Sequence, residues 1–480
     1  MDIKLNTLYE YYKTNHGTLH CGDCQEVLKT IPDNSIDSIV TDPPYELNFM
    51  NKKWDNSGIA YNINMWKECL RVLKPGGHLL SFGSTRTYHR MTCAIEDAGF
   101  EIKNMIEWIY ASGFPKSLNI GKNYDKKMGN KREDLGIVKG MGKQNPEWNG
   151  TAQGRKENYF KPTYKNTKGY SPYEGQGTAL KPAHEPICLA RKPLSEKTII
   201  DNIIKYQTGG LNIDDCRIPV INEKNPKGSA KRVYKNNSYT EEKIYGDNTE
   251  TNPQGRFPAN IICQDDALND GEITKGVSGG GPKQYGGGGG WDNSINRQPI
   301  KEFFNDSGSK SRYFDLDVWA EKHGLLQFPK APKSEKNKGL DNLPDTIKAM
   351  SNGAQFHIDG YDKAQSIGLN RINITKNNHP TIKPLKLISY LVSLITPMQN
   401  MTVLDPFSGS GTTAIASILL NKNFILIEKD PQYCEIAKHR IIHYSNNINQ
   451  STDNKPNNNS NINKPIHNNI IQKTLFLSPL

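Results

Sequence analysis

The chain has 480 residues, which is enough for two or three domains with a large buried core and excludes a disulfide-stabilised miniprotein. Its 61 lysines and arginines outnumber 50 acidic residues, and the net charge of +11 suits a polyanionic partner or simply solubility. Only 35% of the residues are hydrophobic, so we expect loops or disordered segments to dilute the core. The sequence has no run of about 18 apolar residues and no signal peptide, which predicts a cytoplasmic protein without membrane insertion.

The eight cysteines are scattered through the chain, which fits reduced cytosolic thiols better than a disulfide framework. Cys21 and Cys24 form the only CxxC pair. No second pair and no CxxH stands near enough in sequence to complete a zinc site, so we expect no metal.

Residues 18–110 alternate between strand and helix patterns, which is typical of an α/β domain with a mainly parallel sheet. The first clear strand, 35–42, ends in Asp-Pro-Pro-Tyr. A helix is expected over 65–77, where Pro75 and two glycines stop it. The pattern then predicts a strand at 78–84, a helix at 87–100 and a strand at 101–110.

The middle of the chain, 111–378, is rich in glycine, proline, asparagine, lysine and tyrosine, and most of it is interpreted as insertions. The apolar segment 185–194 predicts a further strand of the sheet. Residues 279–290 are too rich in glycine to pack, so they predict a mobile loop.

Regular patterns return at residue 379. They predict a helix with Leu387, Leu391 and Leu394 on one side, a strand at 401–405, a helix from about 412 to 420 and a strand at 424–428. The last three elements form a βαβ unit. The asparagine-rich tail, 446–480, cannot support a core and is expected to be disordered.

The βαβ unit carries the first chemical motif, Asp405-Pro-Phe-Ser-Gly-Ser-Gly-Thr-Thr413, between a strand and a helix. Glycines at this place let the backbone approach a ligand, and free N–H groups at the helix start favour an anionic group. Glu428 closes the next strand, near the distance at which dinucleotide-type folds place an acid on ribose hydroxyls. No lysine follows Gly411, which disfavours ATPase or kinase chemistry. The motif therefore predicts a cofactor site.

The second motif, Asp42-Pro-Pro-Tyr45, follows a strand at the edge where open α/β sheets bind their ligands. Two prolines fix the backbone and aim the flanking Asp42 and Tyr45. The carboxylate can accept a hydrogen bond from an exocyclic amino group, and the tyrosine ring can stack on a planar base. A rigid turn with a solvent-exposed aspartate is the alternative interpretation of this motif alone.

Together, DPPY and DPFSGSGTT resemble the S-adenosylmethionine-dependent DNA amino-methyltransferases, which modify N6 of adenine or N4 of cytosine. The order of DPPY, a long middle, HPTIKP and the glycine loop is similar to the permuted beta group of these enzymes. Segments 112–117 and 181–194 are similar to phage and prophage members. The resemblance implies an α/β fold: a Rossmann-like class I methyltransferase sheet, circularly permuted, with large irregular insertions.

The resemblance also implies roles for single residues. Asp42, Pro43, Pro44 and Tyr45 would hold the target base, with the amino group accepted by Asp42 and the Pro43 carbonyl. The cofactor, S-adenosyl-L-methionine, would be bound by Asp405, Phe407, Gly409 and Gly411 beside its methionine part, Glu428 at the ribose, Asp23 at the adenine amino group, and Thr381 and Lys383 beside its carboxylate.

The leading interpretation is a DNA adenine-N6 methyltransferase that flips its target base out of double-stranded DNA. Adenine is preferred because cytosine-N4 members more often begin the motif with Ser, and an N4-cytosine enzyme remains the alternative. Methylation of RNA or of a protein glutamine is less favoured, because that signature usually opens with Asn and follows its glycine loop. A DNA-binding protein without catalysis is disfavoured by the complete motifs.

We expect the catalytic domain at 1–112, 181–220 and 379–445, with insertions 113–180 and 221–378 forming a target-recognition region. Lysines and tyrosines cluster at 156–173, and basic residues cluster again at 227–235, where they suit phosphate contacts or a solvated face. The terminal Gln472-Lys-Thr-Leu475-Phe476 resembles the peptide by which bacterial replication proteins bind the sliding clamp, although a short match can be accidental. A homodimer and a role in restriction-modification are both compatible with the sequence.

Overall fold

The structure is a computed structural model, and it describes residues 9–47, 53–111, 117–139, 163–219, 232–234, 243–245, 255–264, 267–269, 274–275, 307–323, 337–340, 343, 346–351, 354–358, 371–377, 379 and 381–453. Several sequence predictions lie outside these residues: the glycine-rich segment 279–290, residues 156–162 of the first basic cluster, 227–231 and 235 of the second, and the terminal peptide with Gln472, Leu475 and Phe476.

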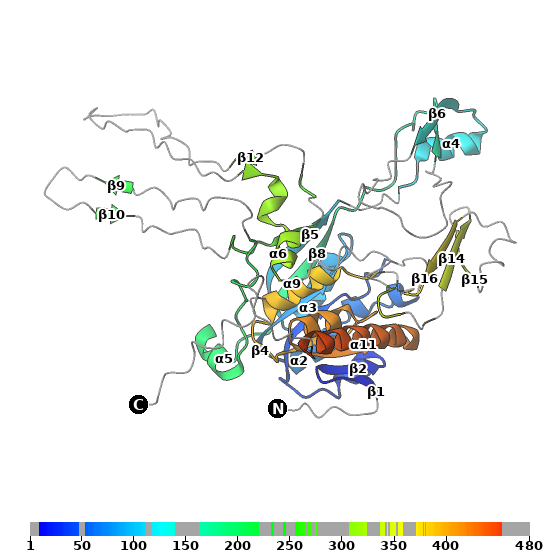
Figure 1. Ribbon diagram of the computed structural model, residues 1–480. Helices are drawn as coiled ribbons and strands as arrows, with labels where there is room; N and C mark the ends of the chain where they lie inside the picture. Colours follow the sequence, from blue (N-terminus) through cyan, green and yellow to red (C-terminus); the bar gives the residue numbers. More distant parts are fainter. Residues whose placement is uncertain are drawn as a thin grey trace, which may run out of the picture.

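Nine strands of the described chain form one sheet (Figure 1). In spatial order they are β1 (Glu10–Lys13), β2 (Gly17–Cys21), β18 (Asn423–Glu428), β17 (Thr402–Asp405), β3 (Ile36–Thr41), β4 (Leu73–Phe82), β8 (His184–Arg191), β5 (Glu101–Tyr110) and β11 (Ile261–Gln264). The strands from β2 to β4 run parallel to one another, whereas β1 is antiparallel to β2 and β8 runs antiparallel between β4 and β5. This arrangement confirms the predicted α/β, Rossmann-like sheet.

The strand order also confirms the circular permutation. β17 and β18 come from the C-terminal part of the chain, yet they lie between β2 and β3 from the N-terminal part. β18 pairs in parallel with β2, and β17 pairs in parallel with β3. The two chain segments that carry the two motifs are therefore neighbours in space.

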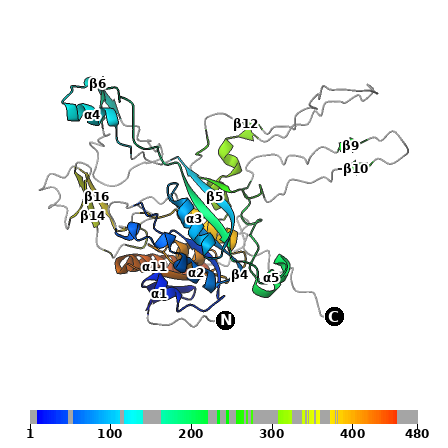
Figure 2. The same ribbon diagram turned by 180° about the vertical axis from the view of Figure 1, so that it is seen from behind.

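Helices cover both faces of the sheet (Figures 1 and 2). Ile39 and Leu79 belong to one core with α1 (Cys24–Leu28), α2 (Ile63–Val72) and α3 (Tyr88–Asp97). The adjacent residues Val40 and Leu80 belong to a second core with α6 (Leu316–Lys322) and α9 (Leu385–Ile395), and α10 (Thr412–Leu419) packs on the same side. Successive strand residues point to opposite faces, so all six positions of β3 are buried.

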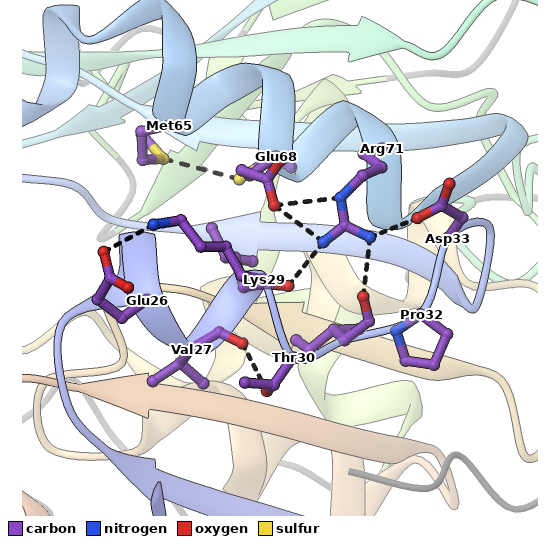
Figure 3. A network of polar contacts seen from close by, with 12 residues as sticks. Glu26, Val27, Lys29, Thr30, Pro32, Asp33, Met65, Glu68 and Arg71 are labelled. Atoms are coloured by element: carbon purple, nitrogen blue, oxygen red, sulfur yellow. Dashed lines mark hydrogen bonds and ion pairs between the residues drawn. The ribbon is translucent and has the colours of Figure 1, made fainter. Parts of the chain in front are cut away.

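Arg71 on α2 fastens α1 to the domain (Figure 3). Its guanidinium donates to the carbonyl oxygens of Leu28 and Ile31 at 2.8 and 2.9 Å, and it also binds the Glu68 carboxylate at 2.9 Å. Leu28 is the last residue of α1, where carbonyl groups have no partner within the helix. Arg71 therefore stabilises the end of the helix that begins at Asp23.

The predicted elements agree with the structure except near their boundaries. The strand at 101–110 is confirmed as β5, but the helix expected over 65–77 ends at Val72 and β4 begins at Leu73. Pro75 has no N–H for a helix, and Gly76 has a φ of 81°, so this segment starts a strand. Other bounds are α5 (Ile199–Tyr206), α11 (Pro431–Asp453), β9 (Arg232–Tyr234), β10 (Lys243–Tyr245), β12 (Thr274–Lys275), β13 (Ser307–Gly308), β14 (Thr346–Ser351), β15 (Ala354–Ile358) and β16 (Arg371–Thr375).

Two boundaries of the expected domains differ from the structure. The segment 221–378, expected to hold only insertions, supplies β11 to the sheet and α6 to the core. Trp319 of α6 is fully buried and packs edge-on against Tyr390 of α9, with ring centroids 5.0 Å apart. At the other end, α11 continues to Asp453, so residues 446–453 are helical where a disordered tail was expected.

One insertion forms a small separate unit that projects from the sheet (Figures 1 and 2). It contains α4 (Ile120–Met128) and the hairpin of β6 (Glu133–Lys139) and β7 (Thr163–Lys168). Arg132 holds it together by ion pairs to Asp125 and Glu174 at 2.5 and 2.6 Å. Within the described residues, no helix is long and apolar enough to cross a membrane.

Candidate active site

The two motifs meet at the carboxyl edge of the parallel strands. β3 ends at Thr41 and leads through α2 to β4, whereas β17 ends at Asp405 and leads through α10 to β18 on the other side. Such a reversal of direction leaves a crevice where open α/β sheets bind ligands. A cavity of about 2350 Å³ lies here. Its lining includes Asp23, Asp42, Pro43, Pro44, Tyr45, Thr381, Lys383, Asp405, Phe407, Gly409 and Glu428, which are all but one of the predicted site residues.

The remaining predicted residue, Gly411, does not line the cavity and lies where the glycine loop joins α10. It begins α10 with a φ of 76°, a conformation that favours glycine, and a Cβ there would lie 3.0 Å from Ala437. Gly409 has a φ of 52°, and a Cβ would lie 2.7 Å from His379 Nε2. The loop therefore needs glycine at both positions to keep its shape.

Asp405 is the internal support of the glycine loop. Its carboxylate accepts hydrogen bonds from the hydroxyls of Thr41 and Thr413 at 2.7 and 2.6 Å, and from the Phe407 N–H at 3.1 Å. Burial raises the pKa of Asp405 to about 6 despite these donors. Because both carboxylate oxygens already accept hydrogen bonds from the protein, the role of Asp405 is to hold the glycine loop next to β3.

Arg440 is a second support, and no motif indicated it in the sequence. Its fully buried guanidinium donates to the Ser410 carbonyl at 2.6 Å and the Ser410 hydroxyl at 2.8 Å. In the same loop, Ser408 Oγ is buried without a hydrogen-bond partner among the described residues. A rigid loop with one unused buried hydroxyl is suited to a ligand with polar groups.

Glu428 and Asp23 lie at the ends of adjacent strands. Glu428 accepts hydrogen bonds from the N–H groups of Gly409 and Asp430, each at 2.8 Å, and burial raises its pKa to about 7. Asp23 begins α1 and pairs with Lys429 at 2.8 Å. Both carboxylates therefore lie beside the glycine loop, and the cofactor roles that the resemblance implied for them stay a prediction.

The DPPY motif is part of a buried charged cluster. Lys383 Nζ lies 2.6 Å from Asp42 Oδ2 and 3.5 Å from Glu185 Oε2. The Tyr45 hydroxyl donates to Glu185 Oε2 at 2.7 Å. The Lys383 ammonium also lies over the rings of Tyr45 and Phe82, 5.1 and 4.9 Å from their centroids. The structure thus places Lys383 against Asp42, where the resemblance implied a place beside the cofactor's carboxylate.

In this cluster, burial and the charge of the ionic partner shift the pKa of each group in opposite directions. Burial raises the pKa of Asp42, and the neighbouring Lys383 offsets part of that rise. Burial alone would lower the pKa of Lys383, but the carboxylates of Asp42 and Glu185 raise it above its usual value. Lys383 therefore stays a cation, and Asp42 is held by an ionic partner at one oxygen.

The second oxygen of Asp42, Oδ1, is buried and accepts no hydrogen bond from the described residues. The nearby Tyr45 hydroxyl has one proton and donates it to Glu185. A buried acceptor without a donor is costly unless a ligand satisfies it. Asp42 Oδ1 is thus a position for an N–H group from outside the protein.

Thr381 and His379 differ in their surroundings. Thr381 is exposed at the cavity, and its N–H donates to His379 Nδ1 at 3.4 Å. The His379 ring packs against Tyr433 with centroids 4.6 Å apart and lies next to Gly409. His379 and Glu185 belong to segments that the sequence marked as motif-like, but only the structure brings them to the two halves of the cavity.

A family model described as DNA methylase, N6_N4_Mtase, matches residues 36–439. The chain belongs to this family of DNA methylases. Membership confirms the resemblance to the S-adenosylmethionine-dependent DNA amino-methyltransferases, and the match contains both motifs of this DNA methylase. The similarity to phage and prophage members stays a prediction.

Several relatives are similar to this DNA methylase over short stretches. The type II methyltransferase M2.MboI of Moraxella bovis is 47% identical over 66 residues, which are 14% of this chain and 24% of that protein. M.BamHI of Bacillus amyloliquefaciens is 41% identical over 81 residues, or 15% and 18% of the two chains. M.HinfI of Haemophilus influenzae is 34% identical over 110 residues, or 19% and 31%. The matched part is thus less than two thirds of each relative.

Solved structures resemble the chain at low sequence identity. The cytosine-N4-specific PvuII DNA methyltransferase is 13% identical with a TM-score of 0.40, and the likeness covers 95% of this chain and 98% of that one. The complex of M1.HpyAVI with SAM is 14% identical with a TM-score of 0.34, over 88% and 98% of the chains.

Proposed function

We propose that this DNA methylase transfers a methyl group from S-adenosyl-L-methionine to an exocyclic amino group of a base in double-stranded DNA. The observation that carries the proposal is Asp42 Oδ1, which has no hydrogen-bond donor in the part of the chain that the structure describes and is buried in the same cavity as the glycine loop. The cofactor would supply a methyl group activated by a sulfonium centre. Its ribose and amino groups suit Glu428 and Asp23, and its methionine part suits the loop from Asp405 to Gly411.

The chain's own groups suit the recognition of an amino group. Asp42 Oδ1 and the Pro43 carbonyl would accept hydrogen bonds from its two N–H groups, which favours a more tetrahedral and nucleophilic nitrogen. Tyr45 would stack on the base and offset part of the stacking energy lost from the duplex. The protein then accelerates the transfer mainly by positioning, and no covalent enzyme intermediate is needed.

We further propose adenine N6 as the target, with cytosine N4 as the alternative. The support is the Asp at position 42, because N4-cytosine members more often begin the motif with Ser. Hydrolysis of the modified DNA and mass spectrometry of its nucleosides distinguishes N6-methyladenine from N4-methylcytosine.

The insertion between β5 and β8 is proposed as part of a target-recognition region. Both strand ends, Tyr110 and His184, line the cavity, so the chain that joins them leaves and returns at the catalytic edge. Exposed lysines on α4, including Lys122, Lys126 and Lys127, suit the phosphates of bound DNA. We also propose a role in restriction-modification for the whole protein, and this proposal rests only on the similarity of the chain to type II methyltransferases.

Substitution of Asp42 tests the proposed function. Purified wild-type protein should transfer a labelled methyl group from S-adenosyl-L-methionine to duplex DNA. Asp42→Ala should lose this transfer and still bind the cofactor, because Asp42 lies on the base side of the cavity, whereas Glu428→Ala should lose cofactor binding first. Absence of transfer by the wild type on DNA that contains all short sequences, or equal loss of cofactor binding in Asp42→Ala, would contradict the proposal.

A further inference from the structure

Glu185 connects the two residues that face the proposed target base. It lies at the start of β8, and because β8 runs antiparallel to β5, its first residues reach the carboxyl edge of the sheet. There Glu185 Oε2 accepts the Tyr45 hydroxyl at 2.7 Å and lies 3.5 Å from Lys383 Nζ. We propose that Glu185 is a positioning residue of the base site, which fixes the Tyr45 ring and sets the charge around Asp42.

The Tyr45 ring is held from both ends. Its backbone carbonyl accepts the Thr87 hydroxyl at 2.8 Å, and its own hydroxyl is bound to Glu185. A tyrosine held at only one end could turn about its side-chain bonds. With both ends fixed, the ring presents one orientation to a flipped base, so stacking costs less conformational entropy.

Lys383 is shared between two carboxylates. Its side chain is only 9% exposed, and it contacts Asp42 more closely than Glu185. One ammonium between two carboxylates leaves the cluster with a net charge of about −1 when both acids are ionised. This charge is complementary to the positive charge that an amino nitrogen gains when it accepts a methyl group.

Glu185 also acts on Asp42 over a distance. Its negative charge raises the pKa of Asp42, in the same direction as burial and against Lys383. Removal of that charge leaves Lys383 to Asp42 alone, so the pKa of Asp42 should fall. The acid limb of the rate profile should then move to lower pH if Asp42 must be ionised for transfer.

Glu185→Gln is the direct test, because glutamine keeps the shape of the side chain and removes its charge. This inference rests on the proposed function, so wild-type transfer to DNA is measured first. We expect kcat to fall by about 10²-fold, the size typical of a misplaced reacting group, with cofactor affinity unchanged. The acid limb should move to lower pH, and Glu185→Asp should restore less than half of the lost rate, because its shorter side chain cannot reach both partners.

Two further variants keep the test decisive. Glu101→Gln removes a carboxylate from the far end of the same strand pair, where Glu101 binds Arg191 at 2.7 Å, and it should leave kcat unchanged. Glutamine can still accept the Tyr45 hydroxyl, so Tyr45→Phe tests that hydrogen bond separately, and it also replaces Glu185→Gln if that variant does not fold by circular dichroism.

A DNA duplex with 2-aminopurine at the target position gives a readout beside activity. The wild type should increase its fluorescence by extruding the base, and Tyr45→Phe should give a different quenching, because a ring without the hydrogen bond to Glu185 no longer stacks in one orientation. An active wild type, together with a Glu185→Gln variant of equal kcat and unmoved acid limb and a Tyr45→Phe variant of equal quenching, overturns this inference alone. An inactive wild type overturns the proposed function instead.

Discussion

The Thr41 hydroxyl donates a hydrogen bond to Asp405 at 2.7 Å, and this contact joins the strand before DPPY to the strand before the glycine loop. The two residues are 364 positions apart in the sequence. Both side chains are buried, so the bond is protected from water. It couples the base side of the cavity to the cofactor side.

Thr41→Val tests this coupling, because valine has nearly the same shape and no hydroxyl. We expect the free energy of unfolding to fall by about 1 to 3 kcal/mol, since the buried Oδ1 of Asp405 loses its shorter hydrogen bond and keeps only the one from the Phe407 N–H. Chemical denaturation measures the change. Thr41→Ser restores the donor and should regain most of the lost stability. Full stability in Thr41→Val would show that the contact does not matter.

Gly409→Ala should weaken cofactor binding more than it weakens the fold. Its φ of 52° disfavours alanine, and the new Cβ would lie 2.7 Å from the His379 ring. Gly129→Ala is the matched control, because Gly129 has a φ of 71° with nothing within 4 Å of its Cβ position. Both variants should lose about 1 kcal/mol of stability, and Gly409→Ala alone should lose S-adenosyl-L-methionine affinity by calorimetry. Equal affinities would argue against a cofactor loop.

Glu428 should make stability and cofactor affinity change with pH in opposite directions. Its pKa of about 7 lies above its usual 4.5, so its stabilising effect is complete below about 4.5 and is lost as pH rises through 7. Cofactor binding needs the ionised carboxylate and should weaken as pH falls below 7. Thermal unfolding and titration calorimetry from pH 5.5 to 8.5 measure both trends, and Glu428→Gln should flatten them. Parallel trends would remove Glu428 from the ribose site.

The lysines of α4 should control how binding depends on salt. Replacement of Lys122, Lys126 and Lys127 by alanine should weaken binding to all duplexes and reduce the slope of log K against log salt by about 0.9 per lost phosphate contact. Fluorescence anisotropy at several salt concentrations measures the slope. Lys205→Ala is the control, because Lys205 lies on α5, which follows the end of β8 opposite the cavity, and this change should leave the slope unchanged. If the variant methylates a different DNA sequence, the α4 lysines contact bases and determine which sequence is recognised.

The terminal peptide stays a prediction, since Gln472, Leu475 and Phe476 lie outside the described residues. If the match to the clamp-binding peptide is not accidental, a fluorescent peptide of residues 468–480 should bind the host's sliding clamp, with Leu475 and Phe476 in an apolar pocket. The affinity is measured by titrating the peptide with clamp at concentrations up to tens of micromolar. A Kd in that range corresponds to a binding free energy of about −6 kcal/mol, which is weaker than that of a typical stable complex. Leu475→Ala with Phe476→Ala should abolish saturable binding. No binding by the natural peptide rejects the docking role.

The sequence predicted the strands and helices of the catalytic core because their apolar patterns are continuous and their ends carry turn residues. It predicted the two motif loops for the same reason, since Asp405 and Asp42 both follow buried strands. It could not predict β11, because the four residues Ile261–Gln264 form a strand only by pairing with β5. The extent of α2 was also missed, because the glycines that usually end a helix here begin a strand.

Within the site, the sequence indicated residue types and the structure supplied their partners. Lys383 was expected beside the cofactor, but its contact with Asp42 depends on the packing of α9 against the sheet. Arg440 lies on α11 with no motif around it, and its contact with Ser410 spans 30 residues. Such contacts depend on how helices dock, which periodicity does not determine.

The permuted strand order has a consequence for synthesis of the protein. β3 is made early, yet one of the two strands beside it, β17, leaves the ribosome only after more than three quarters of the chain. Until then, the nascent β2 and β3 each have one unpaired edge, and apolar side chains such as Val40 lack the helices α9 and α10 that pack on their side of the sheet. A chain released before residue 402 would keep those edges open, so premature termination is expected to yield an aggregating product and no partly active enzyme.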